Sequence, residues 1–196
     1  RPATALHIKS VAPAVLVAVV EHAQVTTARV GLDLSPGERR VERLAIAGRP
    51  GPDAVAALAS HLAREAQRLA AAGRPVAAVA VVAPGTTDAQ LRVSRYALFF
   101  GWRNLDIAGP VEAALGLPAL LVNNTRAMGL AEFRHLGQPR GESLLFVQAR
   151  HGVGAALIDA GSAELGAPSA FSELGHMPVG RNTLVTGLPE RTAAVE

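Results

Sequence analysis

The sequence contains no cysteine, and this absence excludes disulfide bonds and metal sites built from thiolates. Aromatic residues make up only 4% of the 196 residues and hydrophobic residues 49%, so the core must consist largely of Ala, Val and Leu. The most apolar run, residues 11–20, is broken by Pro13 and is shorter than the ~20 residues that span a membrane. Its flanks also lack the features of a signal peptide. We therefore expect a cytoplasmic globular protein without membrane contact.

Lysine is nearly absent, since Lys9 is the only one, and the basic residues are arginines scattered among acids. The net charge is +3. No run of basic residues and no basic-aromatic stripe indicates a nucleic-acid surface within this chain. A solvated surface rich in arginine accounts for the charge.

What is present is an alternation of strands and helices. Residues 14–34 are rich in Val and Thr and predict a two-stranded hairpin, and residues 39–47 predict a third strand. Leucines recur at helical spacing over residues 53–73. In that helix, Asp53 is placed to cap the N-terminus and Gly73 to end the last turn.

The continuous apolar run of residues 76–83 predicts a strand buried on both faces. An aromatic-rich loop should follow, in which Trp102 and its neighbours most simply serve packing. Beyond it we expect a helix at 109–116, a strand at 119–122 and a helix at 125–135.

The polar segment 138–142 predicts a boundary between two lobes. Two more strands, residues 143–149 and 154–160, should pair across a tight turn. The pattern is α/β with mixed strand directions. We divide it into residues 1–13 as a leader or remnant of an upstream segment, 14–137 as a first lobe and 138–196 as the start of a second.

Two adjacent amides, Asn123 and Asn124, stand where the strand ends and the last of these helices begins. Each amide offers donors and an acceptor, which suits sugar hydroxyls. The alternative is that both residues simply cap the helix. Neither amide can accept a proton as a carboxylate would.

Three other places carry candidate site residues. Gly85 follows the apolar strand at the end where ligands gather in α/β sheets, although it also suits a simple turn. Gly152 and Gly154 allow close approach to a phosphate, but glycines are equally common in tight hairpins. Glu173 and His176 lie three residues apart and can face one ligand or merely each other, and further metal ligands are not evident.

Taken in order, these places resemble the ROK family, a name that covers repressors, open reading frames and sugar kinases. The segment GLPALLVNNTRAMGLAEFRHLG is similar to the family's block around an Asn-Asp pair, and SELGHM is similar to its GE-GH motif. SLLFVQARHGVGAALIDAG resembles its second phosphate segment, and VAPGTTDAQLRVSRYALFFGWRNLDI its Pro-Gly turn and tryptophan segment. The resemblance implies an actin-like ATPase (ribonuclease H-like) fold, with the first lobe and part of the second.

The resemblance also implies a sugar site. Its residues would be Gly85, Asn123, Asn124, Glu173, His176 and Glu190. In the family, the aspartate of the Asn-Asp pair deprotonates the attacking hydroxyl, and Asn124 stands at that position. Loss of a general base typically costs ~10²–10⁴-fold in rate.

Two further family features are missing. The first phosphate loop should fall near residues 19–26, where no glycine is present. The cysteine positions of the family's zinc loop are occupied by Arg181, Thr183 and Leu188, so no metal is expected. Gly152 and Gly154 would then be vestiges of a phosphate segment.

We interpret the chain as the ligand-sensing and oligomerisation domain of a ROK-type, sugar-responsive transcriptional repressor, without catalytic activity or cofactor. The resemblance implies a small sugar ligand, a homodimer or higher homo-oligomer, and DNA contact only through a helix-turn-helix upstream of this chain. Two alternatives stay open. One is a fragment of an ATP-dependent sugar kinase, and the other is a pseudo-sensor that retains only dimer contacts.

Overall fold

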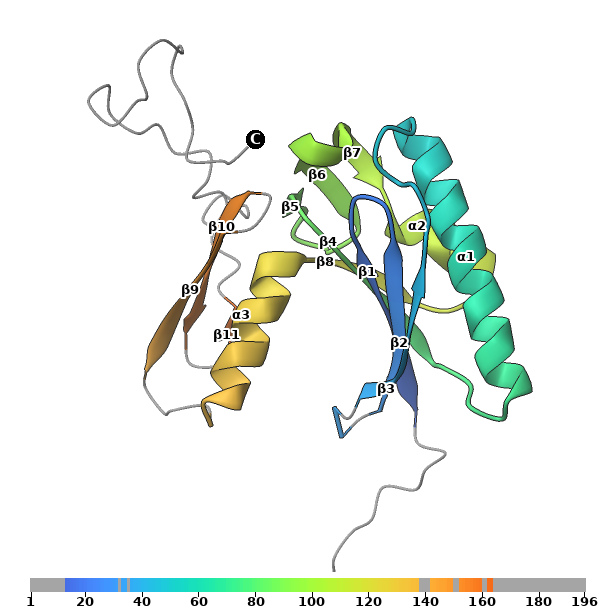
Figure 1. Cartoon of the computed structure of the whole chain (residues 1–196), viewed down its shortest axis with the longest axis horizontal. Coiled ribbons are helices and arrows are strands. Elements are labelled where there is room, and N and C mark those ends of the chain that lie inside the picture. Colours follow the sequence, from blue (N-terminus) through green and yellow to red (C-terminus); the bar gives the residue numbers. More distant parts are fainter. Residues whose placement is uncertain are drawn as a thin grey trace, which may run out of the picture.

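The computed structural model describes residues 13–31, 33–34, 36–137, 142–149, 152–159 and 162–163. In this part of the chain, the strands form three sheets, and helices lie beside them (Figure 1). None of the helices described there has both the length and the apolar character needed to cross a membrane. The largest sheet has five strands in the order β3-β2-β1-β4-β8. These strands are β1 Ala14–Val20, β2 Val25–Gly31, β3 Pro36–Glu42, β4 Ala78–Ala83 and β8 Ala119–Asn123.

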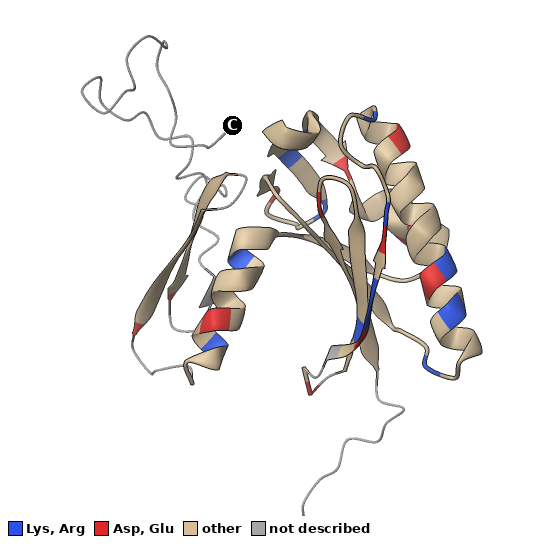
Figure 2. Cartoon of the chain, viewed as in Figure 1, with Lys and Arg blue, Asp and Glu red and all other residues tan. Residues whose placement is uncertain are grey.

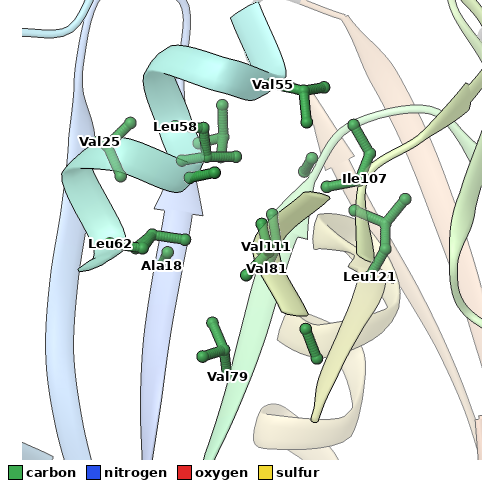
Figure 3. Packing of buried hydrophobic residues seen from close by; sticks show 14 of the residues in the cluster. Ala18, Val25, Val55, Leu58, Leu62, Val79, Val81, Ile107, Val111 and Leu121 are labelled. Atoms are coloured by element: carbon green, nitrogen blue, oxygen red, sulfur yellow. The ribbon is translucent and has the colours of Figure 1, made fainter. Parts of the chain in front are cut away.

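Strand β1 lies at the centre of this sheet, antiparallel to β2 and parallel to β4, which is parallel to β8. The helices α1 (Gly51–Ala71) and α2 (Ala108–Leu115) cover one face (Figure 1). Because side chains alternate along a strand, every second residue of β1 and β4 points toward these helices. Figure 3 shows Val79 and Val81 of β4 in the same cluster as Leu58 and Leu62 of α1. This cluster is the main core.

Helix α1 begins differently from the prediction. Pro50 is the N-cap and a proline occupies the first turn, whereas Asp53 lies inside that turn and makes no capping hydrogen bond. Proline suits this position because its φ is fixed at a helical value and its missing N–H needs no partner. The Asp53 carboxylate still favours the positive end of the helix dipole. The predicted cap is wrong, but the predicted stop is confirmed, since Gly73 follows the helix with a φ of 69°.

Strand β3 covers residues Pro36–Glu42 rather than the predicted 39–47. It pairs with β2 across a bulge between Ala28 and Val30. The chain leaves the sheet after Glu42 because Ile46 is drawn into the core, where it is fully buried. The apolar residues after Glu42 therefore pack into the core and do not extend the strand.

Strand β4 was predicted to be buried on both faces and is buried on only one. Val79, Val81 and Ala83 are buried, whereas Ala80 and Val82 are half-exposed. The difference arises because α1 and α2 lie on the same side of the sheet (Figure 1).

The segment predicted as an aromatic loop forms a second, antiparallel sheet. Its strands are β5 Thr86–Thr87, β6 Val93–Ala97 and β7 Trp102–Asp106, with a short 3₁₀ turn at Leu98–Phe100. Trp102 is buried and its ring stacks on Phe100, with 4.6 Å between ring centroids. The packing role of Trp102 is confirmed, and the loop prediction is wrong because such short strands show little periodicity.

The third sheet lies beside helix α3 (Asn124–His135), which follows β8 directly (Figure 1). Its strands are β9 Ser143–Ala149, β10 Val153–Asp159 and β11 Ser162–Ala163. The predicted pairing of β9 with β10 is confirmed. A Cβ atom at Gly129 of α3 would lie 3.1 Å from the Cβ of Phe146, so helix and sheet are in close contact. Residues 138–141 of the predicted lobe boundary lie outside the described residues.

A charged network joins the edge strand β3 to α1, and Figure 2 shows acidic and basic residues interspersed along this helix. Glu65 accepts two hydrogen bonds from Arg68, the shorter one 2.6 Å from Nη2 to Oε1. These bonds hold the pKa of Glu65 below its usual value although burial raises it. On the same side, Nδ1 of His61 lies 2.9 Å from Oε2 of Glu42. The contact of His61 with Glu42 joins α1 to the last residue of β3.

Candidate functional site

Asn123 and Gly85 come together at the carboxyl ends of two parallel strands. Ala83 of β4 pairs with Asn123 of β8, so the turn after β4 lies beside the start of α3. The Asn123 side chain is only 3% exposed. Its Nδ2 donates to the Gly85 carbonyl at 2.8 Å, and its Oδ1 accepts from the Arg126 N–H at 2.9 Å. The predicted neighbours are therefore joined directly, and Asn123 caps α3 as the capping alternative expects.

Gly85 is a glycine for a steric reason. Its φ is 94°, and a Cβ atom there would lie 2.3 Å from the carbonyl oxygen of Tyr96 and 2.6 Å from the Cβ of Ala97. Both the backbone conformation and the close approach of β6 exclude a side chain. The turn thus carries the Gly85 carbonyl toward Asn123.

Asn124 is the first residue of α3 and is half-exposed. Its Oδ1 accepts from the Thr125 N–H at 2.8 Å and from the Thr125 hydroxyl at 3.4 Å. Its Nδ2 makes no hydrogen bond to the described residues and can donate to a ligand. Because an amide does not take up a proton near neutral pH, Asn124 can bind a hydroxyl but cannot deprotonate one.

The two glycines of the predicted phosphate segment have different surroundings. Gly154 lies buried in β10, where a Cβ atom would be 2.7 Å from Oγ1 of Thr125. The same Oγ1 accepts from Nε2 of Gln148 at 2.8 Å. Gly154 therefore permits close contact between β10 and α3. Gly152, by contrast, is half-exposed, and a Cβ atom there would meet nothing within 4 Å.

Thr125 and Gln148 were not among the predicted site residues. They join the first turn of α3 to β9 and so carry the contact between the third sheet and the Asn pair. Thr125 follows the Asn pair directly, a position that indicates the first helical turn. No sequence signal singles out Gln148.

The β1–β2 turn occupies the position at which the resemblance places a first phosphate loop. It is closed by its own hydrogen bonds, since the Glu21 N–H donates to the Gln24 carbonyl at 2.9 Å and Gln24 Nε2 donates to Glu21 Oε2 at 2.5 Å. The ring of His22 contacts that of Phe99, with 4.8 Å between centroids. Because the Glu21 N–H is used within the turn, it is not available to a phosphate.

The remaining predicted residues, Glu173, His176 and Glu190, lie outside the described residues, as do Arg181, Thr183 and Leu188 of the expected zinc-loop positions. Within the described part of the chain, no group of three or more His, Asp or Glu side chains is arranged to hold a metal ion.

The sequence and the structure are both similar to those of ROK family proteins. The model of the ROK family matches residues 33–192. A solved ROK family transcriptional regulator, a homologue of the E. coli Mlc protein, superposes with a TM-score of 0.78 at 23% identity, covering 92% of this chain and 45% of the other. A ROK family glucokinase from Streptomyces griseus, solved with glucose and AMPPNP, gives a TM-score of 0.72 at 19% identity, covering 88% and 53%.

A polyphosphate/ATP-glucomannokinase from Arthrobacter sp. strain KM is 26% identical with a TM-score of 0.66, covering 85% of this chain and 64% of the other. No curated protein matches the sequence. The chain spans about half the length of the regulator and the glucokinase. The fold is the actin-like ATPase fold that the sequence predicts.

Proposed function

This chain belongs to the ROK family, and from that premise we propose that it is the ligand-sensing and oligomerisation domain of a sugar-responsive transcriptional repressor. In this proposal it binds a sugar without phosphorylating it. A helix-turn-helix upstream of the chain makes the DNA contact, and the protein acts in the cytoplasm as a homo-oligomer.

The proposal is carried by the side chain of Asn124. It stands where the family resemblance implies the catalytic aspartate, and its oxygen is already engaged by the N–H and hydroxyl of Thr125. An amide whose Nδ2 has no partner among the described residues suits recognition of a sugar hydroxyl, whereas proton abstraction needs a group that titrates. The site therefore favours binding over chemistry.

The closed β1–β2 turn supports the same conclusion. A phosphate loop needs backbone N–H groups that point at the ligand, usually presented by glycines. Here the Glu21 N–H is used within the turn and the carboxylate of the same residue lies beside it.

The ligand class we propose is a hexose or an amino sugar. Asn124 would donate to one hydroxyl, and by resemblance Glu173, His176 and Glu190 would contact others. Sugar hydroxyls both donate and accept, so a mixed set of an amide, carboxylates and an imidazole matches them.

The burial of Asn123 is the specific observation that favours a second candidate, the pseudo-sensor. Both polar atoms of this side chain are used inside the protein, on Gly85 and on Arg126. These two internal hydrogen bonds are sufficient to account for an asparagine at this position, without any ligand. In that case the domain would retain dimer contacts alone.

An assay of ADP release tests the absence of kinase activity. We expect no sugar-dependent ADP release from the wild-type protein with ATP, magnesium and any common hexose. Asn124→Asp should remain inactive, because the carboxylate alone does not restore a phosphate loop. Asn104→Asp, at an exposed position of β7, is the matched control. Turnover by the wild type that is abolished by Asn124→Leu would show that the chain is a sugar kinase.

A further inference from the structure

The side chain of Asn124 is held in one of its two amide orientations. Its Oδ1 accepts from the Thr125 N–H at 2.8 Å and from the Thr125 hydroxyl at 3.4 Å. If the amide were turned over, its NH₂ group would face these two donors and could accept neither hydrogen bond. The surroundings therefore select the orientation in which the oxygen faces Thr125.

The hydroxyl of Thr125 serves as a donor because a second residue occupies its acceptor side. Nε2 of Gln148, in β9, donates to Oγ1 of Thr125 at 2.8 Å. A threonine hydroxyl carries a single proton, and with Gln148 on its oxygen this proton remains for Oδ1 of Asn124. Thr125 is only 3% exposed, so water competes little for these hydrogen bonds.

The third sheet is built to make this contact with α3, which lies beside it (Figure 1). Gln148 of β9 and Gly154 of β10 are directly paired in the sheet. A Cβ atom at Gly154 would lie 2.7 Å from Oγ1 of Thr125, so any side chain there would displace the hydroxyl. A glutamine on one strand and a glycine on the other thus hold the Thr125 hydroxyl between them.

The three side chains form a chain of hydrogen bonds in which every donor points toward Asn124. Gln148 donates to Thr125, and Thr125 donates to Asn124. Hydrogen bonds in such a chain polarise and strengthen one another. An amide oxygen accepts two hydrogen bonds, and both are supplied here by Thr125. The amide of Asn124 therefore has donors to offer a ligand but no acceptor.

We propose that Gln148 and Thr125 are positioning residues that fix the Asn124 side chain as a hydrogen-bond donor, so that the sugar oxygen facing it must accept. This inference rests on the proposed sugar-sensing function and narrows its ligand. The aspartate that the family resemblance implies for this position would accept a hydrogen bond from the hydroxyl, so the polarity of the contact is reversed. The site then requires an acceptor at that sugar position and tolerates one that has no proton.

Sugar analogues test the polarity of the contact. In the sugar that binds best, each hydroxyl is replaced in turn by hydrogen and by fluorine, which accepts weakly and cannot donate. The hydroxyl that faces Asn124 is the one whose removal has no effect in Asn124→Leu. At this position the deoxy analogue should bind the wild type about three- to tenfold more weakly than the parent sugar, and the fluoro analogue should bind better than the deoxy analogue. Asn124→Asp should reverse the order of the two analogues, because fluorine then faces a carboxylate. A fluoro analogue that binds the wild type no better than the deoxy analogue would overturn the proposed polarity.

Thr125→Val and Gln148→Leu test the positioning role, since each removes a hydrogen bond with little change of volume. Both should weaken the parent sugar about two- to tenfold and leave the affinity of the deoxy analogue unchanged, because the deoxy analogue does not use the contact. Thr125→Ser keeps the hydroxyl and should restore binding, and Gln67→Leu, at an exposed position of α1, is the matched control. Circular dichroism verifies folding, and either variant carries the test if the other unfolds. Equal weakening of both sugars would show a merely structural role and overturn the proposal.

A measurement without sugar separates this inference from the proposed function. In isotope-labelled protein, the NMR signal of the Asn124 side-chain NH₂ group is assigned by its loss in Asn124→Asp. Gln148→Leu should move this signal through Thr125, should not move it further in a Thr125→Val background, and Gln67→Leu should leave it in place. These shifts in a protein that binds no sugar would contradict the sensing function and retain the positioning of Asn124. A signal that Gln148→Leu does not move would overturn the positioning role even if sugars bind.

Discussion

The side chain of Asn123 connects three parts of the structure with two hydrogen bonds. It ends β8, caps α3 through the Arg126 N–H, and holds the turn after β4 through the Gly85 carbonyl. All of this takes place in a position that is only 3% exposed. Its neighbour Asn124 is half-exposed, and its Nδ2 makes no hydrogen bond to the described residues. The side chain of Asn123 therefore holds the local structure together, and that of Asn124 is the one placed to contact a ligand.

Replacing Asn123 by alanine should destabilise the protein by about 1–3 kcal/mol. The helix loses its cap, and the Gly85 carbonyl loses its donor. Urea unfolding followed by circular dichroism measures the change. The matched control is Asn124→Ala, which removes only a local hydrogen bond at a half-exposed position and should cost less than about 1 kcal/mol. Equal losses in the two variants would show that Asn123 does not tie β4 to α3.

A second residue-scale prediction concerns Glu173, which the family resemblance places in the sugar site. Truncation to alanine should weaken sugar binding by about 1.5–3 kcal/mol, because a hydroxyl loses a charged acceptor. Calorimetry with the sugar that binds best measures the loss. Unchanged affinity in Glu173→Ala would remove this residue from the site.

The sequence identifies the neighbourhood of these residues but not their hydrogen bonds. Asn123 and Gly85 each follow an apolar strand, and the ends of parallel strands converge, so their proximity could be predicted. The inward direction of the Asn123 side chain could not, because its partner Gly85 is 38 residues away. The same holds for Gly154, whose close contact with Thr125 depends on how β10 packs on α3.

At the scale of elements, the side chain of Glu112 connects α2 to two other segments through hydrogen bonds. It lies in α2 and accepts two hydrogen bonds from Arg92, at 3.1 and 2.6 Å, and one from the Ala119 N–H at 3.1 Å. It thereby links α2 to the residue before β6 and to the first residue of β8. The hydrogen bonds from Arg92, and then that from Ala119, lower the pKa of Glu112 to about 2.

The lowered pKa predicts an acid-dependent loss of stability. A carboxylate with a depressed folded-state pKa stabilises the protein above its unfolded value of 4.5 and loses that effect as the pH falls toward about 2. Glu112→Gln should therefore be less stable than the wild type at pH 7, with a difference that shrinks between about pH 4.5 and pH 2. Thermal unfolding over this range measures it. Glu38→Gln, at an exposed position on β3, is the matched control. If the difference in stability between Glu112→Gln and the wild type is the same at every pH, the charge of Glu112 does not contribute to stability.

Elements with a strong period were predictable and short ones were not. The apolar spacing of α1 located this helix within a few residues. The sheet of β5, β6 and β7 was missed because strands of two and five residues carry too little alternation. The end of β3 was misplaced because Ile46 leaves the strand for the core, a tertiary effect that local pattern does not contain.

At the scale of the molecule, one fold serves both regulators and kinases, so the fold does not decide the activity. The chain superposes on a ROK transcriptional regulator with a TM-score of 0.78 and on a ROK glucokinase with 0.72. The chemistry of single positions separates the two functions. Asn124 cannot take up a proton near neutral pH, and its Nδ2 makes no hydrogen bond to the described residues.

Sugar binding by the intact chain is the measurement that tests this account most directly. Calorimetric titration with a panel of hexoses and N-acetylated hexosamines should give saturable heat for at least one of them, with one site per chain. Asn124→Leu should weaken that binding by about tenfold or less, as expected for the loss of one neutral hydrogen bond, and Asn104→Asp should leave it unchanged. A folded protein that gives no heat with any sugar of the panel would contradict the sensing function and make the pseudo-sensor the better description.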